Sequence, residues 1–138
     1  MLKIDEKTQE SLTGALFSYY ENIRRGNLQV LSALMSEESY FITLESFGFR
    51  HVFKESAFKE LLNNIGNDEA SLKKVETVIS DDLKKESREH TIEVVSFEPK
   101  APERITLHYK EDGHPKKLYF SFSDGMWKID YKAGREKL

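Results

Sequence analysis

One carboxylate in this chain has neighbours that favour proton transfer. Glu45 follows Phe41 and precedes Phe47 and Phe49, so aromatic residues flank it in the sequence. Burial among aromatic rings raises the pKa of a carboxyl group, which would make Glu45 a candidate general base. The alternative interpretation is a solvated glutamate at the end of a strand, with no chemical role.

The four histidines do not predict a metal site. They are His51, His90, His108 and His114, and none forms the H-x-H, H-x-x-x-H or H-E-x-x-H spacing of a metal-binding motif. His51 precedes an expected helix and could contact a ligand at the mouth of a pocket. His108 lies on the expected polar face of a sheet together with Tyr119, where both could contact a second copy of the chain.

Other reaction types lack the residues that they need. The chain has no cysteine, which excludes thiolate nucleophiles, disulfides and cysteine-bound metals. It has neither a G-x-S-x-G motif nor a glycine-rich phosphate loop, and its seven glycines are dispersed. We therefore expect no ATP, NAD, flavin or other cofactor.

An aromatic segment precedes the helix that we expect over residues 55–64. It contains Phe47, Phe49 and Phe53, whereas connecting segments are normally polar. Such a segment suggests a lid over a cavity or a surface that meets a partner. The same rings could instead fill the interior and leave no pocket, and the sequence leaves these alternatives open.

Length and charge bound the class of protein. The 138 residues fit a single domain, residues 1–138. The net charge is −3, and lysines occur as scattered pairs near acidic residues instead of the basic stripe of a nucleic-acid binder. No apolar run has the length of a membrane span or the pattern of a signal peptide. We expect a cytoplasmic protein that binds neither membranes nor nucleic acids.

Helical periodicity comes first in the chain and strand alternation follows. The 3.6-residue spacing predicts helices over residues 6–25, 28–35 and 55–64, with Asp5 and Gly26 as caps of the first. Alternation predicts strands over residues 40–45, 73–80, 91–98, 104–110, 117–122 and 126–131. We expect a turn at residues 36–39, connectors at residues 46–50 and 99–102, and a long hairpin tip over residues 81–90. This order indicates an α+β fold in which three N-terminal helices pack on a curved antiparallel sheet.

Two Asp-Gly pairs define the end of the sheet. Asp112-Gly113 and Asp124-Gly125 separate the last three strands and provide the positive φ angles of tight hairpin turns. Alternation puts one set of residues on an apolar face: Ile105, Leu107, Tyr109, Leu118, Phe120, Phe122, Trp127, Ile129 and Tyr131. It puts a second set on a polar face: Thr106, His108, Lys110, Lys117, Tyr119, Ser121, Lys128 and Asp130. We expect the helices to cover the apolar face.

The order of these elements resembles the nuclear transport factor 2-like superfamily, which includes ketosteroid isomerases and polyketide cyclases. Residues 19–27 resemble the end of its first helix, and residues 34–38 resemble the end of its second helix. Residues 124–129 resemble its final hairpin, Asp-Gly-x-Trp-x-Ile. The resemblance implies a cystatin-like conical barrel with a pocket between sheet and helices, commonly dimeric through the outer sheet face.

The isomerases of this superfamily use a tyrosine near the end of helix 1, an acid on the first strand and a second acid on a late strand. Tyr19 resembles the tyrosine by its distance from Gly26. The position of the base is Thr43, and the strand expected over residues 117–122 carries no acid. Glu45 would share the strand face of Thr43. This defines an enzyme alternative with Glu45 as base and Tyr19 as hydrogen-bond donor.

The main expectation is a non-catalytic module that binds a small apolar molecule in an aromatic pocket or that dimerises. The alternatives are the isomerase- or cyclase-type enzyme and a protein-interaction domain with a filled cone. The candidate pocket residues are Tyr19, Tyr40, Glu45, Phe49, His51, Phe53, Tyr109, Phe120 and Trp127. A homodimer would form through the outer sheet face around His108 and Tyr119.

Overall fold

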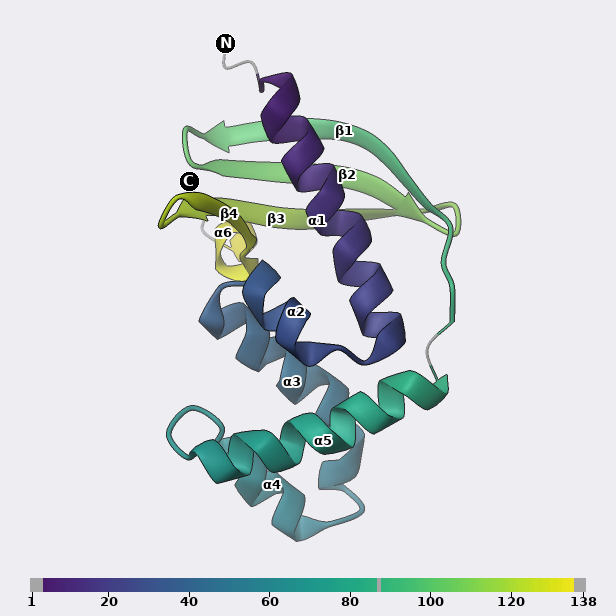
Figure 1. Cartoon of the computed structure of the whole chain (residues 1–138), viewed down its shortest axis with the longest axis vertical. Helices are drawn as coiled ribbons and strands as arrows, with labels where there is room; N and C mark the ends of the chain where they lie inside the picture. Colours follow the sequence, from purple (N-terminus) through teal and green to yellow (C-terminus); the bar gives the residue numbers. More distant parts are fainter. Residues whose placement is uncertain (1–3, 87, 136–138) are drawn as a thin grey trace.

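A computed structural model describes residues 4–86 and 88–135, which form an α+β fold with six helices and one four-stranded antiparallel sheet (Figure 1). The helices are α1 (Glu6–Arg25), α2 (Leu28–Leu34), α3 (Glu37–Val52), α4 (Ser56–Asn63), α5 (Glu69–Glu86) and α6 (Tyr131–Arg135). The strands are β1 (Ile92–Ala101), β2 (Arg104–Glu111), β3 (His114–Ser123) and β4 (Met126–Ile129), in that spatial order. The α+β class is thus confirmed, but five helices instead of three precede the sheet.

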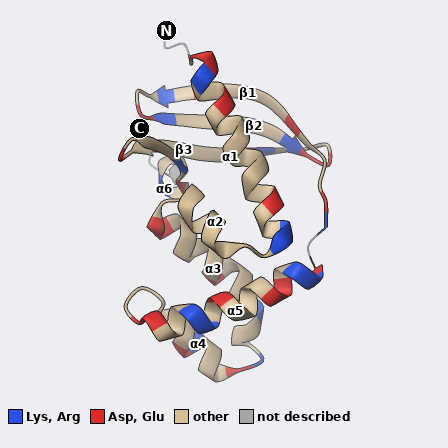
Figure 2. Cartoon of the chain, viewed as in Figure 1, with Lys and Arg blue, Asp and Glu red and all other residues tan. Residues whose placement is uncertain are grey.

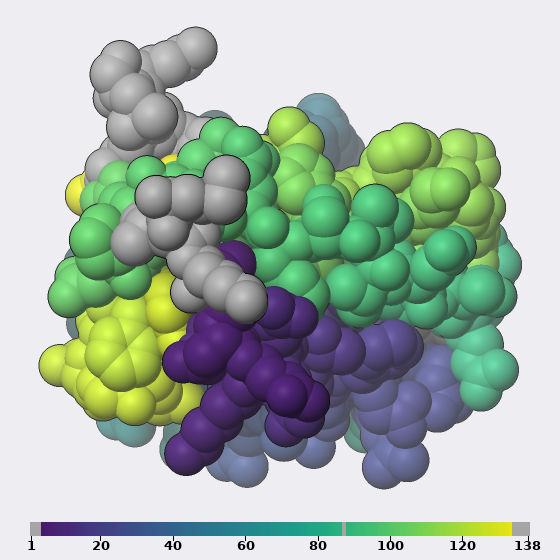
Figure 3. Space-filling view, turned by 90° about the horizontal axis from the view of Figure 1, so that it is seen from above, coloured from purple at the N-terminus to yellow at the C-terminus, as the bar shows by residue number. Residues whose placement is uncertain are grey.

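The first helix forms where its caps and its apolar stripe predict it. The Asp5 carboxylate accepts a hydrogen bond of 2.7 Å from the Thr8 amide, and this bond lowers the pKa of Asp5. Gly26 ends α1 in the left-handed conformation with a φ of 67°. Leu12 and Leu16 are fully buried one turn apart, and α1 lies against β1 in the view from above (Figure 3). The predicted helix 6–25 is confirmed.

The predicted strand at residues 40–45, the turn before it and the connector after it are wrong, because α3 spans all three. Ser36 caps this helix by accepting a hydrogen bond from the Ser39 amide. Tyr40, Leu44 and Gly48 are buried at intervals of four residues, which is the repeat of one helix face. The alternation of six residues was too short to outweigh this longer pattern, in which the apolar face packs on neighbouring elements.

The predicted strand at residues 73–80 is also wrong, and so is most of the hairpin tip at residues 81–90. Residues 69–86 form α5 instead, and Ser87 lies outside the described residues. Val75 and Ile79 are β-branched, which favours a strand, but both are fully buried one helical turn apart. Helix α5 packs against α1, α3 and α4, so tertiary contacts override the local β preference (Figure 1).

The sheet is a meander in which the last three strands lie close to their predicted bounds. Both Asp-Gly turns have positive φ angles at both residues, 52° and 85° at Asp112-Gly113 and 52° and 78° at Asp124-Gly125. Three details differ from expectation. The structure places Pro99 inside β1 at a register irregularity, β4 ends at Ile129, and Tyr131 begins α6.

The predicted apolar face of the sheet forms the core together with α1. Its buried members are Ile105, Leu107, Tyr109, Leu118, Phe120 and Ile129. Phe122 lies farther along β3 and is 38% exposed, and Trp127 is partly buried. Thr106 is buried although it lies on the opposite, mainly polar face, which we call the outer face. Among the described residues, no helix has both the length and the apolar character needed to cross a membrane.

Candidate functional site

Tyr19 lies in a chain of hydroxyl groups between α1, α3 and α6. Its hydroxyl is 3.5 Å from that of Tyr131, which is 3.2 Å from Oγ1 of Thr43. Thr43 Oγ1 also donates to the Ser39 carbonyl at 2.9 Å. Burial, and then Tyr131, raise the pKa of Tyr19 well above its usual value, so the phenol stays protonated. This chain of hydroxyl groups links α1, α3 and α6.

The structure does not bring Glu45 to this chain of hydroxyls. Glu45 is exposed on α3, whereas Thr43 two positions earlier is buried. Residues two apart on a helix point to different sides, so the shared strand face that was expected for Glu45 and Thr43 does not exist. The aromatic burial expected for Glu45 is therefore wrong.

The remaining pocket candidates are divided between the core and the surface. Tyr40, Tyr109 and Phe120 are buried members of the core, and Trp127 packs at its edge. The structure exposes Phe49 by 60% and Phe53 by 78%, as an edge-to-face pair at the end of α3. His51 contacts Asp82 of α5 and ties α3 to α5. The structure thus divides these described residues between the buried core and the exposed surface.

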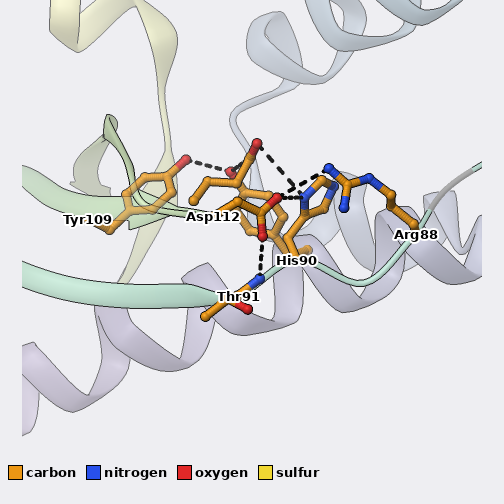
Figure 4. A network of polar contacts seen from close by, with 7 residues as sticks. Arg88, His90, Thr91, Tyr109 and Asp112 are labelled. Carbon is orange, nitrogen blue, oxygen red and sulfur yellow. Dashed lines mark hydrogen bonds and ion pairs between the residues drawn. The ribbon is translucent and has the colours of Figure 1, made fainter.

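A polar cluster that the sequence did not predict lies where the start of β1 meets the β2–β3 turn (Figure 4). We call it the corner cluster; it consists of Tyr20, His90, Glu111 and Asp112. His90 Nδ1 is 2.8 Å from Oδ2 of Asp112 and 3.9 Å from Oε2 of Glu111. The Tyr20 hydroxyl donates to Oε1 of Glu111 at 2.6 Å. Four polar side chains from α1, β2 and the segments beside β1 and β2 thus converge.

Protonation in the corner cluster follows from these contacts. His90 and the Thr91 amide lower the pKa of Asp112, which therefore carries a negative charge at neutral pH. Burial, followed by the hydrogen bonds with Glu111 and Tyr109, raises the pKa of Tyr20. Tyr20 is thus a permanent hydrogen-bond donor that orients the Glu111 carboxylate. The geometry suits the binding of a cation more than the transfer of a proton.

A second candidate site is a groove on the outer face of the sheet, with a volume of about 690 Å³. We call it the outer groove; its lining includes Val95, His108, Lys110, Lys116, Lys117 and Tyr119. The volume lies in the range of small-molecule sites. Register places Lys117 opposite His108 on the outer face, whereas Lys116 lies opposite the buried Tyr109 and so belongs to the other face of the strand.

The outer groove combines apolar walls with positive charge. Val95 and Tyr119 provide apolar surface, and lysine stems extend it. Neither Lys116 nor Lys117 has an ion-pair partner within the part of the chain that the structure describes. His108 instead contacts Glu98 at 2.8 Å, and Lys100 contacts the same carboxylate at 2.8 Å. Elsewhere, positive and negative residues alternate, as along α5 (Figure 2).

No protein-family model, curated protein or solved structure matches this chain. Function therefore has to be inferred from the two sites themselves. The sequence placed His108 and Tyr119 on the polar face of the sheet, but it predicted a dimer interface there and not a groove for a ligand. It did not indicate the corner cluster, because residues 20, 90 and 111–112 are far apart and no local spacing connects them. The one sequence feature that pointed to the corner cluster was the acidic residue of the Asp112-Gly113 turn.

Proposed function

We propose that this protein is a non-catalytic binding module that holds a small anionic molecule with an apolar body in the outer groove. The observation that carries this proposal is the placement of Lys110 and Lys117 beside a hollow that Val95 and Tyr119 also line. Lysine ammonium groups attract carboxylates, sulfonates and phosphates, while Tyr119 and Val95 remove apolar surface from water. The interior expected to hold the ligand is occupied by buried side chains such as Phe120.

Homodimerisation is the second candidate function of the outer face. The exposed side chain of Val95 beside Tyr119 favours it, since exposed apolar surface promotes association. A two-fold interface would place the same patch against itself, so Lys110 and Lys117 would approach lysines of the second copy. Like charges at an interface cost free energy, and for this reason the groove favours a small anion over a second copy.

We also propose a distant relationship to the nuclear transport factor 2-like superfamily. Helices precede an antiparallel meander, and the final Asp-Gly turn joins β3 to β4 in an antiparallel hairpin. An isolated parallel bridge joins Met35, directly after α2, to Ile129 of β4. The helical segment at residues 37–52 then replaces the strand of the cone.

The test uses 8-anilinonaphthalene-1-sulfonate, an aromatic sulfonate whose fluorescence rises in apolar sites. We expect saturable binding that weakens about tenfold in Lys117→Glu, a loss of about 1.4 kcal/mol, and in Tyr119→Ala. Binding should also weaken at high salt. The matched control is Lys128→Glu, because Lys128 lies on the outer face of β4 but does not line the groove.

Equal affinity of the wild-type protein, Lys117→Glu and Tyr119→Ala for this probe would refute the proposed site. Light scattering of the same samples tests whether the outer face forms a homodimer. A dimer mass for the wild-type protein that changes to a monomer mass in Tyr119→Ala would assign the outer face to self-association instead.

A further inference from the structure

The corner cluster directs three metal-ligand atoms toward one point. They are Nδ1 of His90, Oε2 of Glu111 and Oδ2 of Asp112, and all lie within 4.8 Å of one another. Ligand atoms about 2.0–2.1 Å from a tetrahedral zinc ion lie roughly 3.3 Å apart. The distances from His90 Nδ1, 2.8 Å to Asp112 and 3.9 Å to Glu111, lie on either side of this value.

The other oxygen of each carboxylate is held by a separate partner. The Thr91 amide donates to Oδ1 of Asp112 at 2.9 Å, which leaves Oδ2 directed at His90. The Tyr20 hydroxyl donates to Oε1 of Glu111 at 2.6 Å, which leaves Oε2 toward the same imidazole. Tyr20 is itself 2.8 Å from the Tyr109 hydroxyl. Such outer contacts orient the ligands of metal sites in proteins.

We propose that His90, Glu111 and Asp112 form a binding site for a divalent transition-metal ion, best filled by Zn²⁺. One imidazole nitrogen and two carboxylate oxygens suit Zn²⁺, whereas Mg²⁺ and Ca²⁺ prefer sites made of oxygen alone. Three protein ligands leave further positions to water. The ion would take the place of the hydrogen bond between His90 Nδ1 and Oδ2 of Asp112, because an imidazole coordinates a metal through an unprotonated ring nitrogen.

Access and charge are compatible with this ion. A hollow of about 160 Å³ beside the cluster is lined by Tyr20, Arg88 and His90 among others. The Arg88 guanidinium, on a mostly exposed side chain, lies 3.4 Å from Oδ2 of Asp112 (Figure 4). This long contact costs little to break, since exposed ion pairs contribute little free energy. The two carboxylates would then balance the charge of the ion.

The proposal is tested by isothermal titration of ZnCl₂ into the tag-free full chain after treatment with a chelator. We expect one zinc ion per chain with micromolar or tighter affinity. Asp112→Asn and His90→Ala should each weaken binding by about a hundredfold, and Tyr20→Phe by about tenfold because the outer contact is lost. Asparagine tolerates the φ of 52° at position 112, so this variant retains the turn.

The matched control is His114→Ala, which removes an exposed histidine at the start of β3 outside the cluster and should leave the affinity unchanged. Lys117→Glu should also leave it unchanged, so the metal site and the outer groove can fail separately. A measurement on the unmodified protein adds a second criterion: Mn²⁺ should broaden the NMR amide signals of Thr91, Glu111 and Asp112 first. Absence of saturable zinc binding, or equal affinity in Asp112→Asn and the wild-type protein, would overturn the proposal.

Discussion

The two faces of the sheet are built by the same strands but have opposite character. On the inner face, Leu107 and Phe120 are fully buried against the helices. On the outer face, the adjacent residues of these strands, His108 and Tyr119, border an open groove that lysines also line. Strand alternation places successive side chains on opposite faces, so burial on one face leaves the other available. Burial of the inner face thus leaves the outer face and its corner open, and these are the two places where we propose that ligands bind.

The largest expected effect tests whether the inner face is filled. Phe120→Ala should lower the free energy of unfolding by about 3–5 kcal/mol, because it removes a fully buried ring and leaves a cavity. Urea unfolding of both proteins measures the difference. The matched control is Phe122→Ala on the same strand, where the ring is 38% exposed and the loss should be clearly smaller. Equal losses for the two variants would show that the inner face is not the core.

A smaller effect on stability distinguishes Gly26, at the buried end of α1, from Gly14 on the exposed side of the same helix. In Gly26→Ala the new Cβ would lie 2.6 Å from the Ser80 carbonyl oxygen, and the φ of 67° is strained for alanine. We expect a loss of at least about 1–2 kcal/mol. Gly14→Ala should instead stabilise the protein by about 1 kcal/mol, because alanine is the better helix former.

Gly14 has room for a methyl group, since no atom lies within 4 Å of a Cβ built there. Thermal unfolding of the two variants provides the test. A lower melting temperature for Gly14→Ala than for Gly26→Ala would contradict the packing described here.

The smallest effect is a pH dependence on the outer face. Lys100, and then His108, lower the pKa of Glu98 to about 2. The unfolded chain has a glutamate pKa of about 4.3, so ionised Glu98 stabilises the fold above that pH. The contribution disappears as the pH falls toward about 2. The difference in free energy of unfolding between the wild-type protein and Glu98→Gln should therefore become smaller as the pH falls from about 4.3 to about 2. Urea unfolding at several pH values measures this difference.

Lys100→Ala provides the comparison for this pH dependence. Lys100 lowers the pKa of Glu98 more than His108 does. The effect of Glu98→Gln on stability should therefore depend less on pH in the Lys100→Ala background than in the His108→Ala background. A difference between the wild-type protein and Glu98→Gln that stays constant from neutral pH to about 2 would rule out these contacts in solution.

The predictable parts of the fold are those in which one local signal is strong. The Asp5 cap and the left-handed Gly26 defined α1, and the two Asp-Gly turns defined three strands. Helices α3 and α5 were missed because short runs of β-branched and aromatic residues alternate inside longer helical patterns. In both helices, packing of one face against other helices decides the conformation.

The sequence by itself determined the α+β class, the hairpin turns and the division of the last three strands into an apolar and a polar face. These follow from local backbone preferences and from period-2 alternation, which need no distant partner. Only the tertiary structure decided that Glu45 is exposed, that Thr43 meets Tyr131, and that His90 meets Asp112. Each of these three placements depends on contacts between segments far apart in the chain. Burial and strand register bring such side chains together, and sequence spacing does not encode either of them.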